Sequence, residues 1–400
     1  MTDQRIPAIP AAVAGLNAEW LTSALRSRGA LRDGDSVSSF TSTILGEGEG
    51  FLGELARVEL QYAGAADGAP RTVIAKFPTM IPENRGLGTM LGVYEHEIRF
   101  YTELAEHVGV RVPDCYFGDL DPEPRSAVIM GRVLGLLPDR VTLMLLDRLT
   151  LAAGKSARRF GLLIEDLDTA RVGDQVAGAT LEDAEVALVA LARLHARFWE
   201  SPLLDRAWLP RPSDAPRITH GLFERAWPVF EQRFRDRLTP QVRRNTDWVA
   251  EHGVALLNRV ARPPVTLVHG DYRLDNLMFN DGDGEEPVTI IDWQGVMVAN
   301  PMVDVAYFIR PNLPPELADS AEQDLLALYH RTLVEGGVTG YDFDRCRADY
   351  NLGQLFVLHL GVILIGTLDL SHERGIAIVD RAIERTLVAT PNIDPDSVDL

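Results

Sequence analysis

The pattern of apolar and polar positions predicts two regions with different secondary structure. Short stretches rich in β-branched and aromatic residues predict strands at 37–45, 55–62 and 72–77. From Leu181 onward apolar residues recur at i, i+3 and i+4, which is typical of helices. We therefore expect an α+β architecture, in which a β-rich N-terminal lobe and a helical C-terminal lobe enclose a cleft.

Further elements follow from the same pattern. In the N-terminal part the sequence predicts helices at 17–28 and 94–107. It also predicts strand-like segments at 126–130 and 162–167, separated by a loop-rich stretch that includes GLLPDR. In the C-terminal part it predicts a mostly helical insert at 201–264 and two short strands, VTLVH and VTIID, in a small hairpin. The apolar stretch 355–368 carries His359 and is shorter than a bilayer span, so we interpret it as a buried core helix.

Composition and charge narrow the classes of partner. The 400 residues are 46% hydrophobic and 24% charged, as in an ordinary globular protein, and suffice for two or three domains or lobes. The net charge of −19 disfavours nucleic acid and anionic membranes as main partners. Cys115 and Cys346 cannot form a disulfide framework, and the first 20 residues lack the pattern of a signal peptide. We expect a cytoplasmic protein, and no obligate protein partner is evident.

The strongest chemical motif is HGDYRLDN at 269–276, followed by IIDWQ at 290–294. Asp271, Asn276 and Asp292 present oxygen-bearing side chains from two adjacent strand ends. Oxygen ligands of this kind suit Mg²⁺, which takes a few carboxylates together with substrate phosphates. Asp271 is then left to face a hydroxyl group, as phosphoryl transfer requires. The alternative for Asp271 is a carboxylate that merely forms a turn after a strand.

The N-terminal part contains a glycine-rich segment that suits phosphate binding and a lysine within an apolar strand. Gly48, Gly50 and Gly53 fit G-x-G-x-x-G between two strands, where glycines let backbone amides approach phosphates; a tight hairpin is the alternative. Lys76 lies in the apolar strand VIAKF, and an exposed position at a sheet edge is its alternative.

In combination, HGD, Asn at +5 and IDWQ resemble the aminoglycoside phosphotransferase, choline kinase and ecdysteroid kinase-like branch of the protein-kinase-like superfamily. The resemblance covers roughly 45–308 and implies a bilobal protein-kinase-like fold. It implies a nucleotide-binding lobe at 1–166 with a hinge near 165–168. The remaining lobe, 167–400, would hold the catalytic loop 269–276, the metal loop 292–294 and acceptor-binding helices. The implied cofactors are ATP and Mg²⁺.

The resemblance also implies roles for individual residues. Asp271 would be the catalytic base, and Asn276 and Asp292 would bind the metal. Gly48, Gly50, Gly53 and Lys76 would contact the phosphates, while Glu165 and Leu167 would belong to the hinge that contacts adenine. Glu97 would pair with Lys76, although Glu95 or Glu103 could take that place. His269 would support the catalytic loop, and Asp304 would steady it by hydrogen bonds. Arg273 either faces the γ-phosphate or pairs with Asp275, and His195 is interpreted as a core histidine.

The sequence departs from protein kinases in ways that favour a small-molecule acceptor with a hydroxyl group. The metal motif is Asp-Trp-Gln, and no Ala-Pro-Glu segment or long activation loop follows it. A catalytically silent scaffold and a Ser/Thr protein kinase remain the alternatives. The aromatic residues of 201–264, together with Phe356 and His359, slightly favour an apolar or mixed acceptor, unless they are simply core. The negative charge favours a polycation instead.

Overall fold

The computed structural model describes residues 8–45, 52–124, 129, 133–134, 136–280, 286–367, 373–389 and 393–400. The chain forms two compact units. Unit 1 comprises Met1–Glu106 and Pro113–Asp168, and unit 2 comprises His107–Val112 and Thr169–Leu400. The chain thus passes into unit 2 two residues beyond the predicted boundary at 166. The segment 107–112 joins unit 2 because the carbonyl of Arg111 accepts a hydrogen bond from the Ile290 amide at 3.0 Å.

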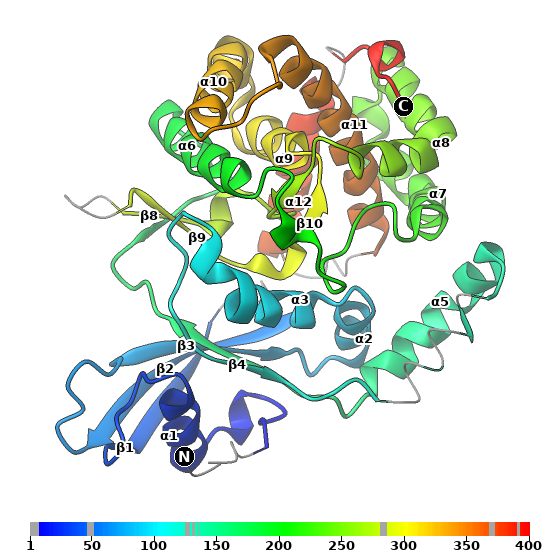
Figure 1. Cartoon of the computed structure of the whole chain (residues 1–400). Coiled ribbons are helices and arrows are strands. Elements are labelled where there is room, and N and C mark those ends of the chain that lie inside the picture. The colour runs from blue at the N-terminus through cyan, green and yellow to red at the C-terminus, as the bar shows by residue number, and fades with distance from the viewer. Residues whose placement is uncertain are drawn as a thin grey trace. The chain divides into compact units, whose positions relative to one another are not determined.

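Unit 1 is built on a five-stranded antiparallel sheet, with the strand order β1-β2-β3-β5-β4 (Figure 1). Its strands are β1 (Ser36–Leu45), β2 (Gly53–Ala63), β3 (Thr72–Pro78), β4 (Cys115–Leu120) and β5 (Phe160–Glu165). The predicted meander of the first three strands is confirmed by their pairing. The sequence pattern missed β4, a short strand that contains Gly118 and Asp119, two residues that are rare in strands.

The helix α1 (Ala18–Ser27) covers the apolar face of this sheet. Its cap is Asn17, whose side chain accepts a hydrogen bond from the Trp20 amide at 2.9 Å. Trp20, Leu21 and Leu25 are buried together with Val73, Phe77 and other sheet residues. The predicted helix at 94–107 is also present, as α3 (Val93–Arg99), a π-helical turn (Phe100–Leu104) and a 3-10 turn (Ala105–His107).

The prediction of a loop-rich stretch before β5 is wrong. This stretch contains α5 (Asp139–Gly154), which packs on another helix that the pattern missed, α2 (Pro82–Met90). The two helices approach closely enough that a Cβ atom at Gly86 would lie 2.0 Å from the Thr150 carbonyl oxygen. Of the predicted strand at 126–130 only Ile129 is described, and its conformation is helical.

Unit 2 is mainly helical, as predicted. Its helices are α6 (Leu181–Arg197), α7 (Pro216–Arg233), α8 (Pro240–Val260), α9 (Met302–Asn312), α10 (Pro315–Glu335), α11 (Phe343–Thr367) and α12 (Glu373–Ala389). Short 3-10 turns are η1 (Val13–Gly15) in unit 1, and η4 (Pro202–Leu204), η5 (Arg235–Arg237), η6 (Leu274–Asn276), η7 (Trp293–Gly295) and η9 (Pro395–Ser397) in unit 2. The fold class inferred from the sequence, an antiparallel sheet region followed by a mainly helical region, is confirmed.

The apolar stretch 355–368 begins inside α11. Among the described residues, α11 alone is long and apolar enough to cross a membrane, but 72% of its most apolar window is buried inside the structure. Burial of this kind is what we expected of a core helix.

Each of the two sequence motifs follows a short strand of unit 2, but these two strands do not pair with each other in the hairpin that we expected. The strand before the first motif, β7 (Thr266–Val268), pairs with β10 (Met297–Ala299). The strand before the second motif, β9 (Val288–Ile290), pairs with β8 (Leu277–Phe279), which in turn pairs with β6 (Arg171–Val172). The chain thereby crosses from one small sheet to the other through the predicted catalytic loop.

Aromatic side chains fill the core between α7, α8 and α11. Phe223, Phe230, Phe234, Phe356 and His359 are all buried. Most aromatic residues that we considered for acceptor binding are therefore core residues, the second of the two interpretations. Within this core the Nδ1 atom of His220 lies 3.3 Å from the Nε2 atom of His359. Burial, together with the neighbouring His220, lowers the pKa of His359 from 6.5 to about 3.

This histidine pair predicts sensitivity to acid. Between pH 6.5 and 3 the unfolded chain binds a proton at His359 that the folded protein excludes, so stability falls as the pH decreases through this window. We expect the free energy of unfolding to be lower at pH 5 than at pH 7.5 by about 2 kcal/mol from this group alone. Urea unfolding at both pH values measures it.

His359→Phe should lose this part of the pH dependence, whereas His252→Gln, which changes an imidazole outside the pair, should retain it. The same pH dependence in His359→Phe as in the natural protein would contradict the assignment.

Candidate active site

The loop that we predict to be catalytic, residues 269–276, begins where β7 ends, and a buried carboxylate holds its backbone. Asp304, in the first turn of α9, accepts hydrogen bonds from the His269 amide at 2.6 Å and the Gly270 amide at 2.9 Å. The Oδ2 atom of Asp304 also lies 3.3 Å from Nε2 of His195, which is buried and bonded through Nδ1 to the Tyr329 hydroxyl. His195 is thus part of the core that surrounds Asp304.

Two glycines allow the two motifs to touch. Gly270 has a φ of +79°, a conformation that L side chains rarely adopt. A Cβ atom at Gly270 would lie 2.1 Å from the carbonyl oxygen of Gly295, in the turn that follows Asp292. The glycine of the HGD motif is therefore needed both for the turn and for the close approach of the two loops.

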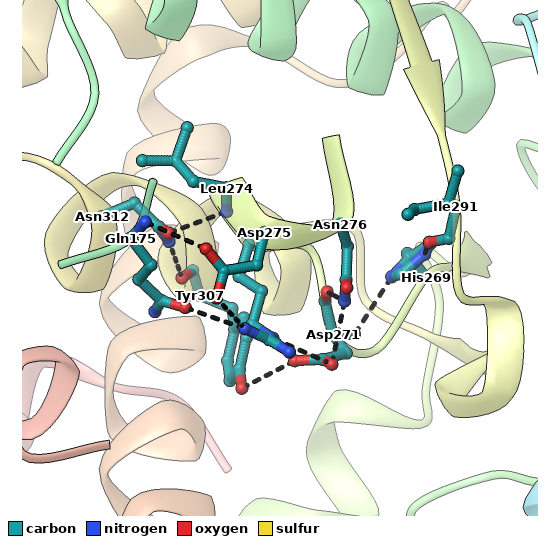
Figure 2. A network of polar contacts seen from close by, with 10 residues as sticks. Gln175, His269, Asp271, Leu274, Asp275, Asn276, Ile291, Tyr307 and Asn312 are labelled. Carbon is teal, nitrogen blue, oxygen red and sulfur yellow. Dashed lines mark hydrogen bonds and ion pairs between the residues drawn. The ribbon is translucent and has the colours of Figure 1, made fainter. Parts of the chain in front are cut away.

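Asp271 lies within a network of polar contacts, which Figure 2 shows from close by. Its Oδ2 atom accepts hydrogen bonds from Nδ2 of Asn276 at 2.9 Å and from Nε of Arg273 at 3.2 Å. Its Oδ1 atom accepts one from the hydroxyl of Tyr307 at 3.0 Å. Burial and the neighbouring Asp271 raise the pKa of Tyr307 well above its usual value, so this hydroxyl keeps its proton.

Arg273 pairs with carboxylates. Besides Asp271, its guanidinium contacts Oδ2 of Asp275 at 2.8 Å and the side-chain oxygen of Gln175 at 3.3 Å. Burial alone would lower the pKa of Arg273, but Asp271 and Asp275 raise it, and the side chain stays charged. Of the two roles that we considered for Arg273, the structure shows the ion pair with Asp275.

Asn276 and Asp292 are brought together by backbone pairing. The Ile291 amide donates to the Asn276 carbonyl oxygen at 3.0 Å, so Asp292 follows directly after this contact. Asp292 has a φ of +62°, a strained conformation for a residue other than glycine. Trp293 beside it is fully buried, and its ring nitrogen donates to the Ile290 carbonyl at 3.1 Å. This anchor holds Asp292 in its unusual conformation.

The donor atoms of Asn276 and Asp292 suit a magnesium ion. Because the Asn276 amide nitrogen donates to both the carbonyl and the carboxylate of Asp271, its amide oxygen is the atom available to a cation. In the described part of the chain, no group of three or more His, Cys, Asp or Glu residues could hold a metal ion. An amide oxygen and a carboxylate oxygen are nevertheless ligands of the kind that Mg²⁺ takes together with several water or phosphate ligands.

The ring of His269 connects the two loops. Its Nε2 atom lies 2.9 Å from the Ile291 carbonyl oxygen, and its Nδ1 atom accepts a hydrogen bond from the Asp271 amide at 3.3 Å. With both ring nitrogens engaged by backbone groups, His269 is arranged to hold the loop and not to move a substrate proton.

In unit 1 the structure brings Lys76 and Glu97 together. The Lys76 ammonium lies 2.6 Å from a carboxylate oxygen of Glu97, and both side chains are largely buried. Glu95 and Glu103, the alternative partners, contact Arg99 instead. Gly53 begins β2 opposite Pro78, whereas Gly48 and Gly50 lie outside the described residues.

The predicted hinge lies at the end of β5. The Glu165 carboxylate accepts a hydrogen bond from the Asp114 amide at 3.1 Å, and the Glu165 amide donates to the Asp114 carbonyl at 2.8 Å. Leu167 is half-buried and lies just before the chain passes into unit 2. A hinge that contacts a nucleotide through main-chain groups leaves no side-chain signature in the sequence.

Sequence reasoning missed residues that support the catalytic loop from a distance. Asn312 accepts a hydrogen bond from the Leu274 amide at 3.0 Å, and the Gln175 amide donates to Asp275 at 3.1 Å.

Arg385, on α12, is buried and donates to the main-chain carbonyls of Gln175, Val176, Ala177, Pro311 and Asn312, at 2.7–3.5 Å. Burial lowers the pKa of Arg385, and the nearby Arg381 lowers it further. Nothing in the local sequence around Arg385 signals these contacts.

Comparison with known families finds a match to a family model. Residues 213–337 match the model of the ecdysteroid kinase-like family. The matched residues, about a third of the chain, include the catalytic loop, Asp292 and Asp304. This match confirms the resemblance inferred from the motifs and agrees with the prediction of a small-molecule kinase.

Individual proteins show more distant similarity. Acyl-CoA dehydrogenase family member 10 of Mus musculus is 35% identical over 100 residues, which cover 24% of this chain and 9% of that protein. The matching region thus spans less than a tenth of this curated relative. A proposed aminoglycoside phosphotransferase from Ralstonia eutropha JMP134 is 14% identical, with a TM-score of 0.49 over 94% of this chain and 98% of the other. An ethanolamine kinase from Plasmodium vivax is 12% identical, with a TM-score of 0.45 over 88% and 82%.

The contacts of Asp304 predict a loss of stability when its charge is removed. In Asp304→Asn one of the two loop amides faces an NH₂ group in place of an oxygen. We expect a loss of about 2 to 3 kcal/mol in the free energy of unfolding, measured by urea denaturation. Asp319→Asn, which changes a largely exposed carboxylate paired with Arg310, should cost less than about 1 kcal/mol. Equal losses in the two variants would contradict this role for Asp304.

Arg385 predicts a second, independent stability effect. Arg385→Met removes the donors of several buried carbonyl groups, so we expect the free energy of unfolding to fall by about 2 to 4 kcal/mol. Arg381→Met, on an exposed position of the same helix, should change it by less than about 0.5 kcal/mol. Overlapping urea unfolding curves for the two variants would show that the buried contacts of Arg385 do not stabilise the fold.

Proposed function

We propose that this protein is an ATP-dependent kinase that transfers the γ-phosphate to a hydroxyl group of a small molecule. The observation that carries the proposal is the arrangement around Asp271. Its carboxylate follows β7 and is hydrogen-bonded to Asn276, and the Asn276 carbonyl is bonded to the residue before Asp292. A carboxylate held beside two oxygen ligands for a cation is the arrangement that phosphoryl transfer uses.

In this proposal each residue has a distinct role. Asp271 accepts a hydrogen bond from the acceptor hydroxyl and orients its oxygen toward the phosphate. An aspartate, with an ordinary pKa of about 3.9, is a weak base, so its contribution is mainly positional. Asn276 and Asp292 hold Mg²⁺, which when bound neutralises charge on the phosphate oxygens.

Unit 1 contributes to nucleotide binding. We propose that Lys76 contacts the ATP phosphates and that Glu97 keeps its ammonium group in place, since the two side chains form a short ion pair. Gly53 is proposed to approach the phosphates through its amide, and Glu165 and Leu167 to bound the adenine site through the main chain.

The segment after Asp292 supports a small-molecule acceptor over a protein acceptor. Only η7, β10 and a short connection separate Asp292 from α9, and β10 is paired with β7. A segment that is short and hydrogen-bonded into a sheet offers little surface for docking a polypeptide. We therefore propose a small molecule with a hydroxyl group as the acceptor. Because most of the aromatic residues are buried in the core, most of the support for an apolar acceptor is lost.

The decisive experiment measures phosphate transfer. The natural protein is screened with Mg²⁺-ATP against a library of hydroxyl compounds, with ADP release and phosphorylated product as readouts. Asp271→Asn should retain the thermal stabilisation by Mg²⁺-ATP and lose turnover by about 100- to 10,000-fold, because the acceptor is no longer oriented and deprotonated.

Asp344→Asn, which changes a carboxylate that is 90% exposed, serves as the control and should keep full turnover. Turnover that is equal in Asp271→Asn and the natural protein would refute the role of Asp271. Stabilisation by Mg²⁺-ATP without transfer to any acceptor would favour a catalytically silent scaffold.

A further inference from the structure

The hydrogen bonds of Asp271 leave few positions for a substrate. Each carboxylate oxygen offers two lone pairs. Those of Oδ2 are taken by Asn276 and Arg273, at 2.9 and 3.2 Å. Oδ1 accepts one bond, from Tyr307 at 3.0 Å. Within the described part of the chain, one lone pair of Oδ1 is therefore left for an acceptor hydroxyl.

Tyr307 reaches Asp271 from the element that also holds the loop backbone. Tyr307 lies three residues after Asp304 in α9, so both side chains project from the same face of this helix. Asp304 binds the loop amides before Asp271, and Tyr307 binds the Asp271 side chain. The carbonyl of Tyr307 in turn accepts a hydrogen bond from Asn312, whose Oδ1 accepts from the Leu274 amide. One helix thus fixes the loop at several points.

We propose that Tyr307 is a positioning residue, whose hydroxyl locks the Asp271 carboxylate so that a single lone pair of Oδ1 faces the acceptor hydroxyl. The inference rests on the kinase function proposed above. Asn276 and Arg273 both donate to Oδ2 and neither donates to Oδ1. They therefore do not prevent a movement of the carboxylate that displaces Oδ1. Tyr307 is the donor that fixes Oδ1, the oxygen left for the substrate.

In the proposed chemical step one bond to phosphorus forms, one breaks and one proton moves. The acceptor oxygen forms a bond to the γ-phosphorus as the bond between that phosphorus and the β,γ-bridging oxygen breaks, and ADP leaves with the electron pair. The acceptor proton passes to Oδ1 of Asp271. Tyr307 keeps its own proton throughout and contributes only by holding Oδ1 toward the acceptor.

Tyr307→Phe keeps the ring and removes the hydroxyl group. We expect kcat to fall by about 10- to 100-fold, the range of one hydrogen bond to a charged group. The KM for ATP and the thermal shift by Mg²⁺-ATP should change by less than about twofold, since nucleotide binding does not involve this contact. Such a separation of kcat from KM would not follow from a general loss of structure.

Tyr350→Phe is the matched control. It also removes a tyrosine hydroxyl that donates to a carboxylate, that of Glu322 at 2.7 Å, but outside the catalytic loop. We expect lower stability in this variant with kcat unchanged. If kcat in Tyr307→Phe equals that of the natural protein, or falls equally in Tyr350→Phe, the inference is overturned.

A second measurement separates this inference from the proposed function. The hydroxyl proton of Tyr307, bonded to a carboxylate, should give a slowly exchanging downfield proton resonance that disappears in Tyr307→Phe and shifts in Asp271→Ala. If no acceptor is phosphorylated but this resonance behaves as expected, the kinase proposal fails and the locking contact stands. If the resonance is absent or insensitive to Asp271→Ala, the locking contact is refuted whether or not the protein is a kinase.

Discussion

The buried carboxylate of Asp304 is the contact on which the candidate site depends. It lies on α9, yet it binds the two backbone amides that begin the catalytic loop and so determines where that loop turns. The turn requires the positive φ of Gly270, and only a residue without a side chain permits the adjacent contact with Gly295. The position of Asp271 beside the turn that follows Asp292 results from these backbone constraints.

Much of this site could be predicted because its motifs are local. The order HGD, Asn at +5 and IDWQ is visible in the sequence, and the pairing of β8 with β9 brings Asn276 close to Asp292. The ion pair of Lys76 with Glu97 was implied by the family resemblance, whereas the sequence pattern alone left Glu95 and Glu103 as alternatives. What the sequence could not supply was the pairing of the small strands, because three-residue strands carry too little pattern to choose a partner.

The residues that sequence reasoning missed have in common that they lie far along the chain from the groups they contact. Tyr307, Gln175 and Arg385 act on the loop across long stretches of chain, and Arg385 lies 210 positions from Gln175. Their neighbours in sequence are ordinary helix or loop residues. The helix α5 was missed for another reason: its apolar residues, among them the continuous run 143–146, lie on all sides of the helix and do not follow the one-sided pattern by which a helix is recognised.

The contacts of Arg385 also have a consequence for how the protein folds during its synthesis. Its guanidinium ties α12 to the loop at 175–177 and to the end of α9, the same elements whose Gln175 and Asn312 touch the catalytic loop. A ribosome synthesises the motifs at 269–294 well before residue 385. A nascent chain that already carries Asp271, Asn276 and Asp292 therefore still lacks part of the scaffold that holds them, and the site can reach its final form only after α12 has emerged and docked.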